Sequence, residues 1–188
     1  GSGRLLPGEP AALVLPPGFG DQPEAEQAAT LARLFTYLAL DIPWLEELPV
    51  ADTDGILFGG LRVGSDLWGQ GELSPSAETR AVLWRRRLSK VGRRTKRALE
   101  ESAQRLRAPA DSQAWREAMR IAGLRAAFVL TGSLATVLGQ AMQLDGGFGA
   151  PPGGARAAKL FENTTTREIV GFALSDAALS LRRNAGTL

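Results

Sequence analysis

The chain has 188 residues and contains neither cysteine nor histidine. These absences exclude disulfides, thiolate nucleophiles, histidine general bases and zinc sites built from Cys or His. A carboxylate site for Mg²⁺ or Ca²⁺ is still chemically possible, but no Asp-x-Asp-x-Asp-Gly loop is present. The sequence therefore predicts no catalytic residue, no metal site and no cofactor. Without cysteine there is no support for a disulfide-stabilised extracellular fold, so we expect a cytoplasmic location.

The chain also lacks a strong membrane segment. Residues 126–144 are uncharged, but Thr131, Gly132, Ser133 and Gln140 make this stretch only moderately hydrophobic. We expect a buried helix here and no membrane span. No signal peptide is visible, and residues 1–9 are expected to be a cloning or protease-cleavage remnant without fixed structure.

Charge is sorted along the chain. Residues 1–78 hold twelve acidic and three basic residues, a net charge of −9. Residues 80–107 hold eleven basic and two acidic residues, a net charge of +9. The remaining residues, 108–188, are nearly balanced. An acidic third is thus joined to a strongly basic segment.

The basic residues are densest over thirteen positions. We take eight of them as candidate partner-binding residues: Arg85, Arg86, Arg87, Lys90, Arg93, Arg94, Lys96 and Arg97. Such a cluster suits an acidic protein surface, nucleic acid phosphates or an acidic lipid surface. The alternative is an ordinary solvated helix face, partly paired with the acidic third of the chain. No set of aromatic residues for stacking RNA bases accompanies the cluster.

Two other patterns are interpreted as structural. Four acidic residues (Glu46, Glu47, Asp52 and Asp54) match no ligand spacing and are expected to be solvated loop acids. The segment 146–154 is rich in Gly and Pro and has the glycine spacing of a phosphate loop. It lacks the Lys and Ser/Thr that such a loop requires, so a flexible linker is predicted.

Hydrophobic periodicity predicts a mostly α fold with one core over residues 10–188 and seven to nine helices. At most a short extended element is expected near 11–15. The glycine-rich stretch 52–73 is a weak helix prediction, because each glycine weakens a helix by roughly 1 kcal/mol. A break is expected at 131–133, and a short helix at about 155–161. We expect five side chains to cap helix N-termini: Asp21, Ser74, Ser89, Thr165 and Ser175.

Four segments form a recognisable pattern: Leu88-Ser89, the D-x-x-x-W at 111–115, the run Arg-Ala-Ala-Phe-Val-Leu-Thr-Gly-Ser-Leu at 125–134, and 168–182. Together they resemble an uncharacterised C-terminal domain of large bacterial proteins that contain tetratricopeptide repeats. The chain departs from the family pattern at three positions: Thr131 and Ser133 replace Cys and Asp, and Ala178 replaces an aromatic residue. Some relatives resemble a metallopeptidase-like scaffold, but His-Glu-x-x-His is missing here. The resemblance implies an α-rich domain attached to a repeat scaffold, with no activity to carry over.

These patterns favour a non-catalytic protein-protein interaction or scaffold domain of a larger bacterial protein. Its basic segment 80–107 would dock on an acidic surface of a partner or on another part of the same polypeptide. A nucleic-acid-binding module using the same cluster is the first alternative, and a degenerate enzyme is the second.

Overall fold

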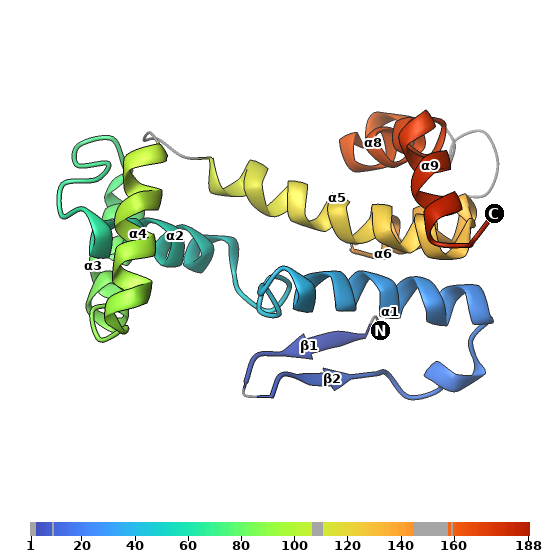
Figure 1. Ribbon diagram of the computed structural model, residues 1–188, viewed down its shortest axis with the longest axis horizontal. Helices are drawn as coiled ribbons and strands as arrows, with labels where there is room; N and C mark the ends of the chain where they lie inside the picture. Colours follow the sequence, from blue (N-terminus) through green and yellow to red (C-terminus); the bar gives the residue numbers. More distant parts are fainter. Residues whose placement is uncertain (1–2, 9, 107–110, 145–157, 159) are drawn as a thin grey trace. The chain divides into compact units, whose positions relative to one another are not determined.

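The computed structural model describes residues 3–8, 10–106, 111–144, 158 and 160–188, and within them the predicted mostly α fold is confirmed. The predicted linker 146–154 and four of the seven residues of the predicted helix 155–161 lie outside the described residues, and the other three, 158, 160 and 161, are helical. The elements with described bounds are β1 (Arg4–Leu6), β2 (Ala12–Val14), the 3-10 helix η1 (Phe19–Asp21), α1 (Glu24–Ala39), α2 (Val50–Gly64), α3 (Pro75–Leu88), α4 (Arg93–Arg105), α5 (Ser112–Thr131), α6 (Leu134–Leu144), α8 (Thr164–Ala173) and α9 (Asp176–Asn184) (Figure 1).

The chain divides into two compact units. Unit 1 comprises Gly1–Glu47 and Arg116–Leu188, and unit 2 comprises Leu48–Trp115. Each unit contains its own cluster of buried apolar side chains. The structure therefore differs from the single core expected over residues 10–188, because the middle of the chain buries its apolar residues among its own helices.

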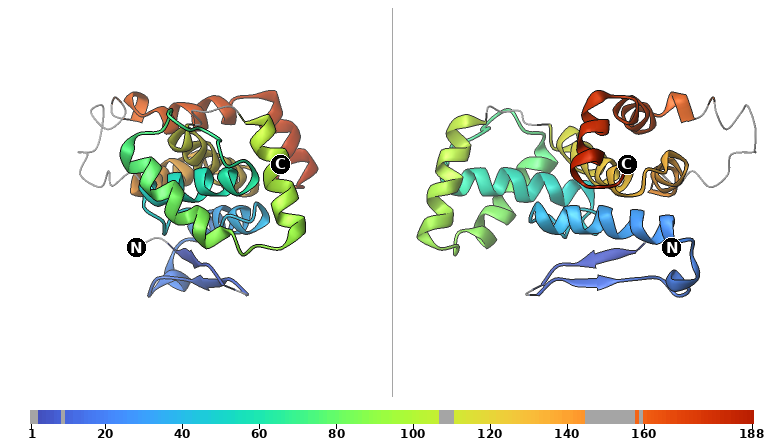
Figure 2. Two further views of the ribbon diagram at one scale, coloured as in Figure 1. Left: turned by 90° about the vertical axis from the view of Figure 1, so that its left-hand side faces the viewer. Right: turned by 45° about the vertical axis from the view of Figure 1, so that its right-hand side comes forward.

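Unit 1 begins with an antiparallel hairpin of β1 and β2, which lies along α1 (Figures 1 and 2). Leu5 pairs with Leu13 across the hairpin and is only 2% exposed. Residues 4–6 are therefore an ordered strand, whereas the sequence suggested an unstructured lead. The leucine side chain provides the physical reason, because it is buried beneath the helix.

The core of unit 1 is built from α1, α5, α6, α8 and α9. Its centre consists of buried small and aliphatic residues with one phenylalanine: Ala29, Ala32, Leu124, Ala127, Phe128, Val137, Ala141, Ile169 and Ala178. The predicted break is confirmed, since α5 ends at Thr131 and Gly132 adopts a φ of 66° before α6 begins. Among the described residues, no helix combines the length and apolar character needed to cross a membrane.

A buried arginine of α1 ties this helix to Glu46, in the segment that follows it, and to Gly3, which precedes β1. Arg33 is 1% exposed, forms an ion pair with Glu46 and donates from Nη2 to the carbonyl of Gly3 at 3.3 Å. Its guanidinium also lies 5.8 Å from the ring centre of Tyr37. Burial raises the pKa of the Tyr37 hydroxyl to about 12, so this ring stays neutral.

Unit 2 is organised around α2, which contacts both α3 and α4. A glycine of α2 lies at each of these two helix contacts. Gly59 faces α3, where an added Cβ would lie 2.8 Å from the backbone nitrogen of Arg85. Gly64 faces α4, where an added Cβ would collide with the backbone of Leu99 and Glu100. The glycines that weaken the helix prediction are therefore the residues that let the backbones approach.

A second buried arginine ties α2 to α3. Arg62 is 4% exposed and forms a bidentate ion pair with Glu78, in which Nη2 donates to Oε2 at 2.7 Å. Its Nε donates to the carbonyl of Trp68 at 2.9 Å, and the Trp68 ring stacks on Phe58 in the core. These hydrogen bonds from Arg62 hold the pKa of the Glu78 carboxyl below its ordinary value.

We predict that Gly64→Ala destabilises unit 2 although alanine is the better helix former. The new methyl group has to push α4 away, and overpacking of this kind costs about 1–3 kcal/mol. Gly171→Ala in α8 is the matched control, because no atom lies within 4 Å of its added Cβ. That control should gain up to about 1 kcal/mol from helix propensity. Urea unfolding of both variants checks the opposite signs, and equal gains would show that α2 and α4 are not in backbone contact.

Removing the carboxylate with Glu78→Gln should cost about 2 kcal/mol near neutral pH. This is less than the ~3–5 kcal/mol of a fully buried pair, since the Glu78 side chain is 41% exposed. Because folding lowers this pKa, the contribution is present above the ordinary carboxyl value and disappears as the pH falls through the lowered one. The stability difference from the wild type should therefore vanish in acid. Glu72→Gln, at an exposed position of the same unit, is the control, and a pH-independent difference would contradict the prediction.

Candidate binding surface at the junction of α3 and α4

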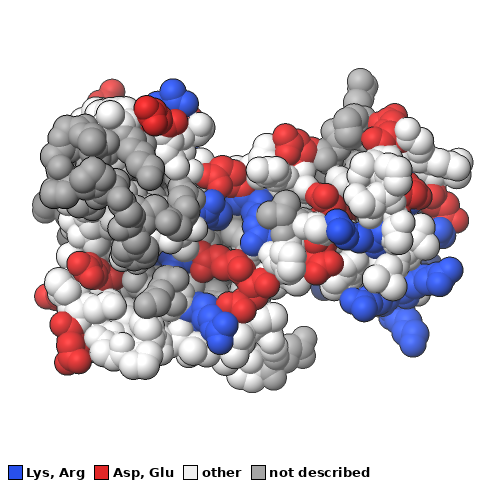
Figure 3. All heavy atoms as spheres, turned by 180° about the vertical axis from the view of Figure 1, so that it is seen from behind, with Lys and Arg blue, Asp and Glu red and all other residues white. Residues whose placement is uncertain are grey.

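The eight predicted binding residues lie together at the end of unit 2 where α3 joins α4. Arg85, Arg86 and Arg87 form the last turn of α3, Lys90 lies in the connection, and Arg93, Arg94, Lys96 and Arg97 occupy the start of α4. Figure 3 shows Lys and Arg side chains gathered on this part of unit 2, at the right of the view. We call these eight residues the basic surface.

Local sequence explains how α3 presents its part of the basic surface. Ser74 caps α3 as predicted, with its hydroxyl accepting from the backbone nitrogen of Ala77 at 3.3 Å, and Pro75 follows in the first turn. The three arginines then fall in the last turn, where cations interact favourably with the carbonyl end of the helix. This end of α3 is electrostatically favourable.

The start of α4 is different. Ser89 was expected to cap this helix, but it ends α3 and its hydroxyl donates to the carbonyl of Arg86 at 2.7 Å. The helix begins at Arg93 instead, after Gly92, and no side chain caps it. Its first turn contains no acidic residue. Three cations therefore stand at the positive end of the helix dipole, an unfavourable position for them.

Few of these cations have an acidic partner. Arg85 pairs with Asp66 at 2.5 Å, and Arg97 lies 3.6 Å from Glu101 with its side chain 82% exposed. The guanidinium of Arg87 lies 5.0 Å from the ring centre of Trp84. Within the part of the chain that the structure describes, the other five form no ion pair and no side-chain hydrogen bond, and all five are exposed: Arg86, Lys90, Arg93, Arg94 and Lys96.

The acidic residues of unit 2 are outnumbered by its basic residues. The acidic third of the sequence is divided between the units, and unit 2 as a whole has twelve basic and eight acidic residues. Within unit 2, the acids of α4 itself, Glu100 and Glu101, are exposed, and Glu78 is held by Arg62. The sequence left open that the chain's own carboxylates already pair with these cations. Among the described residues this holds for Arg85 and weakly for Arg97.

The four acids interpreted as solvated loop residues do not form one group. Glu46 is the partner of buried Arg33 in unit 1, so its interpretation as a solvated acid is wrong. Glu47 lies 3.5 Å from Arg4, whereas Asp54 accepts a hydrogen bond from the hydroxyl of Ser112 in unit 2. Asp52 lies in the first turn of α2. Among the described residues, no three Asp or Glu side chains are grouped closely enough to hold a metal ion.

Sequence reasoning did not identify the ion pairs of the two buried arginines, Arg33–Glu46 and Arg62–Glu78. Both arginines fall at helical spacing among apolar residues, which was a usable signal. Arg62 directly follows the apolar run of α2, and Arg33 lies between Ala32 and Leu34 on the buried face of α1. A charge at a core position requires a partner.

Comparison of the chain with protein-family models, with curated proteins and with solved structures yields no match. The resemblance to the domain associated with tetratricopeptide repeats therefore stays a prediction.

The first turn of α4 gives a test of the electrostatics. Replacing Arg94 by Glu should stabilise unit 2 by about 0.3–1 kcal/mol, because a negative charge interacts favourably with the N-terminal end of a helix. Arg105→Glu, in the last turn of the same helix, should lower stability by a similar amount. Thermal and urea unfolding measure both. A loss of stability in Arg94→Glu would mean that this arginine has a structural role that the contacts do not show.

Proposed function

We propose that the chain is a non-catalytic interaction domain that docks an acidic protein surface through the basic surface of α3 and α4. The acidic surface belongs to a partner protein or to another part of the same polypeptide. The observation that carries the proposal is the group of five exposed cations without an acidic partner among the described residues. Exposed charges of one sign steer association and select partners of the opposite sign.

The composition of the surface favours carboxylates as the target. Six of its eight residues are arginines, whose planar guanidinium groups bind carboxylates through two parallel hydrogen bonds. Arginine also suits phosphate, so nucleic acid is the competing target. Binding to single strands usually adds aromatic stacking platforms. The aromatic residue beside this surface, Trp84, is half-buried and faces Arg87 and the edge of Gly55. This favours protein over single-stranded nucleic acid.

The resemblance noted in the sequence adds a context to the proposal. It supports an α-rich interaction module attached to a tetratricopeptide-repeat scaffold in a larger bacterial protein. In that context the acidic surface lies on a component that the repeat scaffold brings close, which raises its effective concentration. Weak individual ion pairs are then sufficient for docking.

The decisive variant is the double substitution Arg93→Glu and Arg94→Glu. It reverses two exposed cations and should weaken binding about tenfold or more, because attraction is replaced by like-charge repulsion. The melting temperature should not fall, since both positions lie in the first turn of α4. The measurement is affinity purification from the source cell, with quantification of each recovered protein and then direct titration of the purified acidic component.

The matched control reverses two exposed arginines of unit 1, Arg167 and Arg183, and so makes the same change in net charge. If docking is specific, the variant with Arg93→Glu and Arg94→Glu, called the α4 variant, loses binding and the unit 1 control keeps it. Equal recovery with the wild type and the α4 variant would contradict the proposal. Titration with duplex DNA and single-stranded RNA over a range of salt concentrations tests the alternative. Tight binding with a steep salt dependence, abolished by the α4 variant, would assign the surface to nucleic acid.

A further inference from the structure

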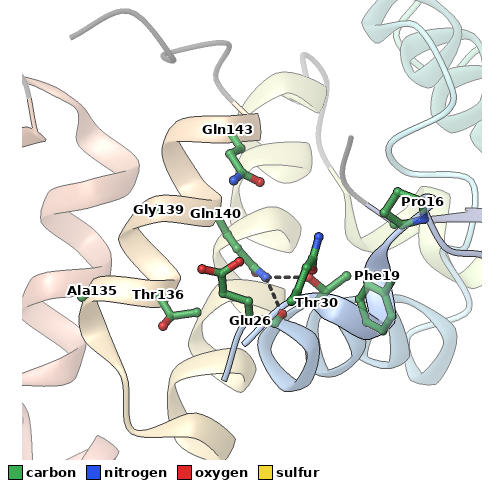
Figure 4. A pocket seen from close by; sticks show the side chains of 11 residues that line it. Pro16, Phe19, Glu26, Thr30, Ala135, Thr136, Gly139, Gln140 and Gln143 are labelled. Carbon is green, nitrogen blue, oxygen red and sulfur yellow. Dashed lines mark hydrogen bonds between the residues drawn. The ribbon is translucent and has the colours of Figure 1, made fainter. Parts of the chain in front are cut away.

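Unit 1 contains a pocket between the N-terminal part of α1 and α6 (Figure 4). Its volume is about 250 Å³, roughly the space of eight water molecules in the liquid. The wall combines one aromatic ring, one carboxylate and several neutral polar side chains: Phe19, Glu26, Thr30, Thr136, Gln140 and Gln143.

Gln140 of α6 is the central polar group of this wall. Its amide nitrogen donates to the hydroxyl of Thr30 at 2.7 Å and to the carbonyl of Glu26 at 3.4 Å, so both amide hydrogens are used on α1 (Figure 4). These two bonds fix the orientation of the amide group. The carbonyl oxygen Oε1 is then left buried without a hydrogen-bond partner, in a residue that is 9% exposed. A buried acceptor without a donor is energetically unfavourable.

The pocket is also unbalanced in charge. Glu26 is its ionisable residue, and neither Lys nor Arg belongs to its lining among the described residues. The Glu26 side chain is exposed and forms no ion pair with the described residues. Figure 4 shows it turned towards the same space that Gln140 enters from the opposite helix. Gln140, with its unpaired acceptor, and the charged Glu26 thus both belong to the lining of one pocket, and the described lining offers no cation.

We propose that this pocket binds a small organic cation with several N–H donors, a guanidinium or a primary ammonium. One N–H group hydrogen-bonds Oε1 of Gln140 and supplies its missing donor, and the charge pairs with the Glu26 carboxylate. Phe19 also lines the pocket, and an aromatic ring attracts a cation that lies over its face. An anion would meet Glu26 without a compensating base. A neutral polyol would leave the carboxylate without a counter-charge.

Agmatine, which has a guanidinium and an ammonium group, is the probe, and isothermal titration calorimetry is the measurement. It should bind the wild-type chain, and Glu26→Gln should weaken the binding at least tenfold by removing the charge while keeping the shape. Glu24→Gln is the matched control, because Glu24 lies in the same first turn of α1 and outside the pocket lining. That variant should bind like the wild type.

A second variant, Gln140→Met, removes the unpaired acceptor and should also weaken binding. Circular dichroism checks whether this variant folds. If it does not fold, the comparison of Glu26→Gln with Glu24→Gln still tests the proposal. A short arginine-containing peptide compared with free agmatine distinguishes a side-chain ligand from a free amine.

Absence of agmatine binding at millimolar concentration, equal affinity for glucose, or unchanged affinity in Glu26→Gln would each overturn the proposal. The outcome is separable from the docking function of unit 2. The double glutamate variant at Arg93 and Arg94 should bind agmatine like the wild type.

Discussion

The close approach of α2 to its two neighbours is the constraint on which unit 2 depends. Gly59 and Gly64 leave space for the backbones of α3 and α4, so that both helices lie against the same short helix. The connection between α3 and α4 then has only the residues from Ser89 to Gly92, which fixes the basic surface at one end of the unit. A side chain larger than hydrogen at either glycine would move a helix that carries part of that surface.

The arginines of this chain fall into two physical classes. Arg33 and Arg62 are buried, and each is held by a glutamate and by backbone carbonyls. Burying a guanidinium without such partners would be strongly unfavourable, so these residues are tied to the fold. Arg93 and Arg94, in the first turn of α4, are exposed and have no ion partner among the described residues. Burial and pairing, which the sequence does not display directly, separate structural from available cations.

Much of the fold could be predicted because helices are local. Hydrophobic periodicity predicted the mostly α fold and the break between α5 and α6, and Ser74 and Ser175 cap their helices as expected. The failures involve competition between neighbouring groups. Asp21 lies in η1, and Asn163 caps α8 in place of Thr165, whose hydroxyl binds the carboxylate of Glu117 instead. A capping motif shows which side chains can cap, and tertiary contacts decide which one does.

The two candidate sites also differ in whether their residues are close in sequence or are brought together by tertiary contacts. The basic surface was visible in the sequence because its residues are close along the chain, and two consecutive helices keep them together. The pocket of unit 1 was not visible, since Glu26 and Gln140 are separated by more than a hundred positions and belong to no motif. The two units, one core each, were also hidden. Hydrophobic periodicity shows that a helix has a buried face but not which other helix covers it.

The start of α4 connects stability with docking. Its first-turn N–H groups have no side-chain cap, and the residues beside them are cations that the helix dipole disfavours. A carboxylate from a partner that settles there would accept hydrogen bonds from the free N–H groups and from the guanidinium groups at once. One bound anion would thus relieve both the missing cap and the repulsion among the cations. Within the described residues the chain supplies no such anion at the first turn of α4, so the docking proposed above would offset this local electrostatic cost.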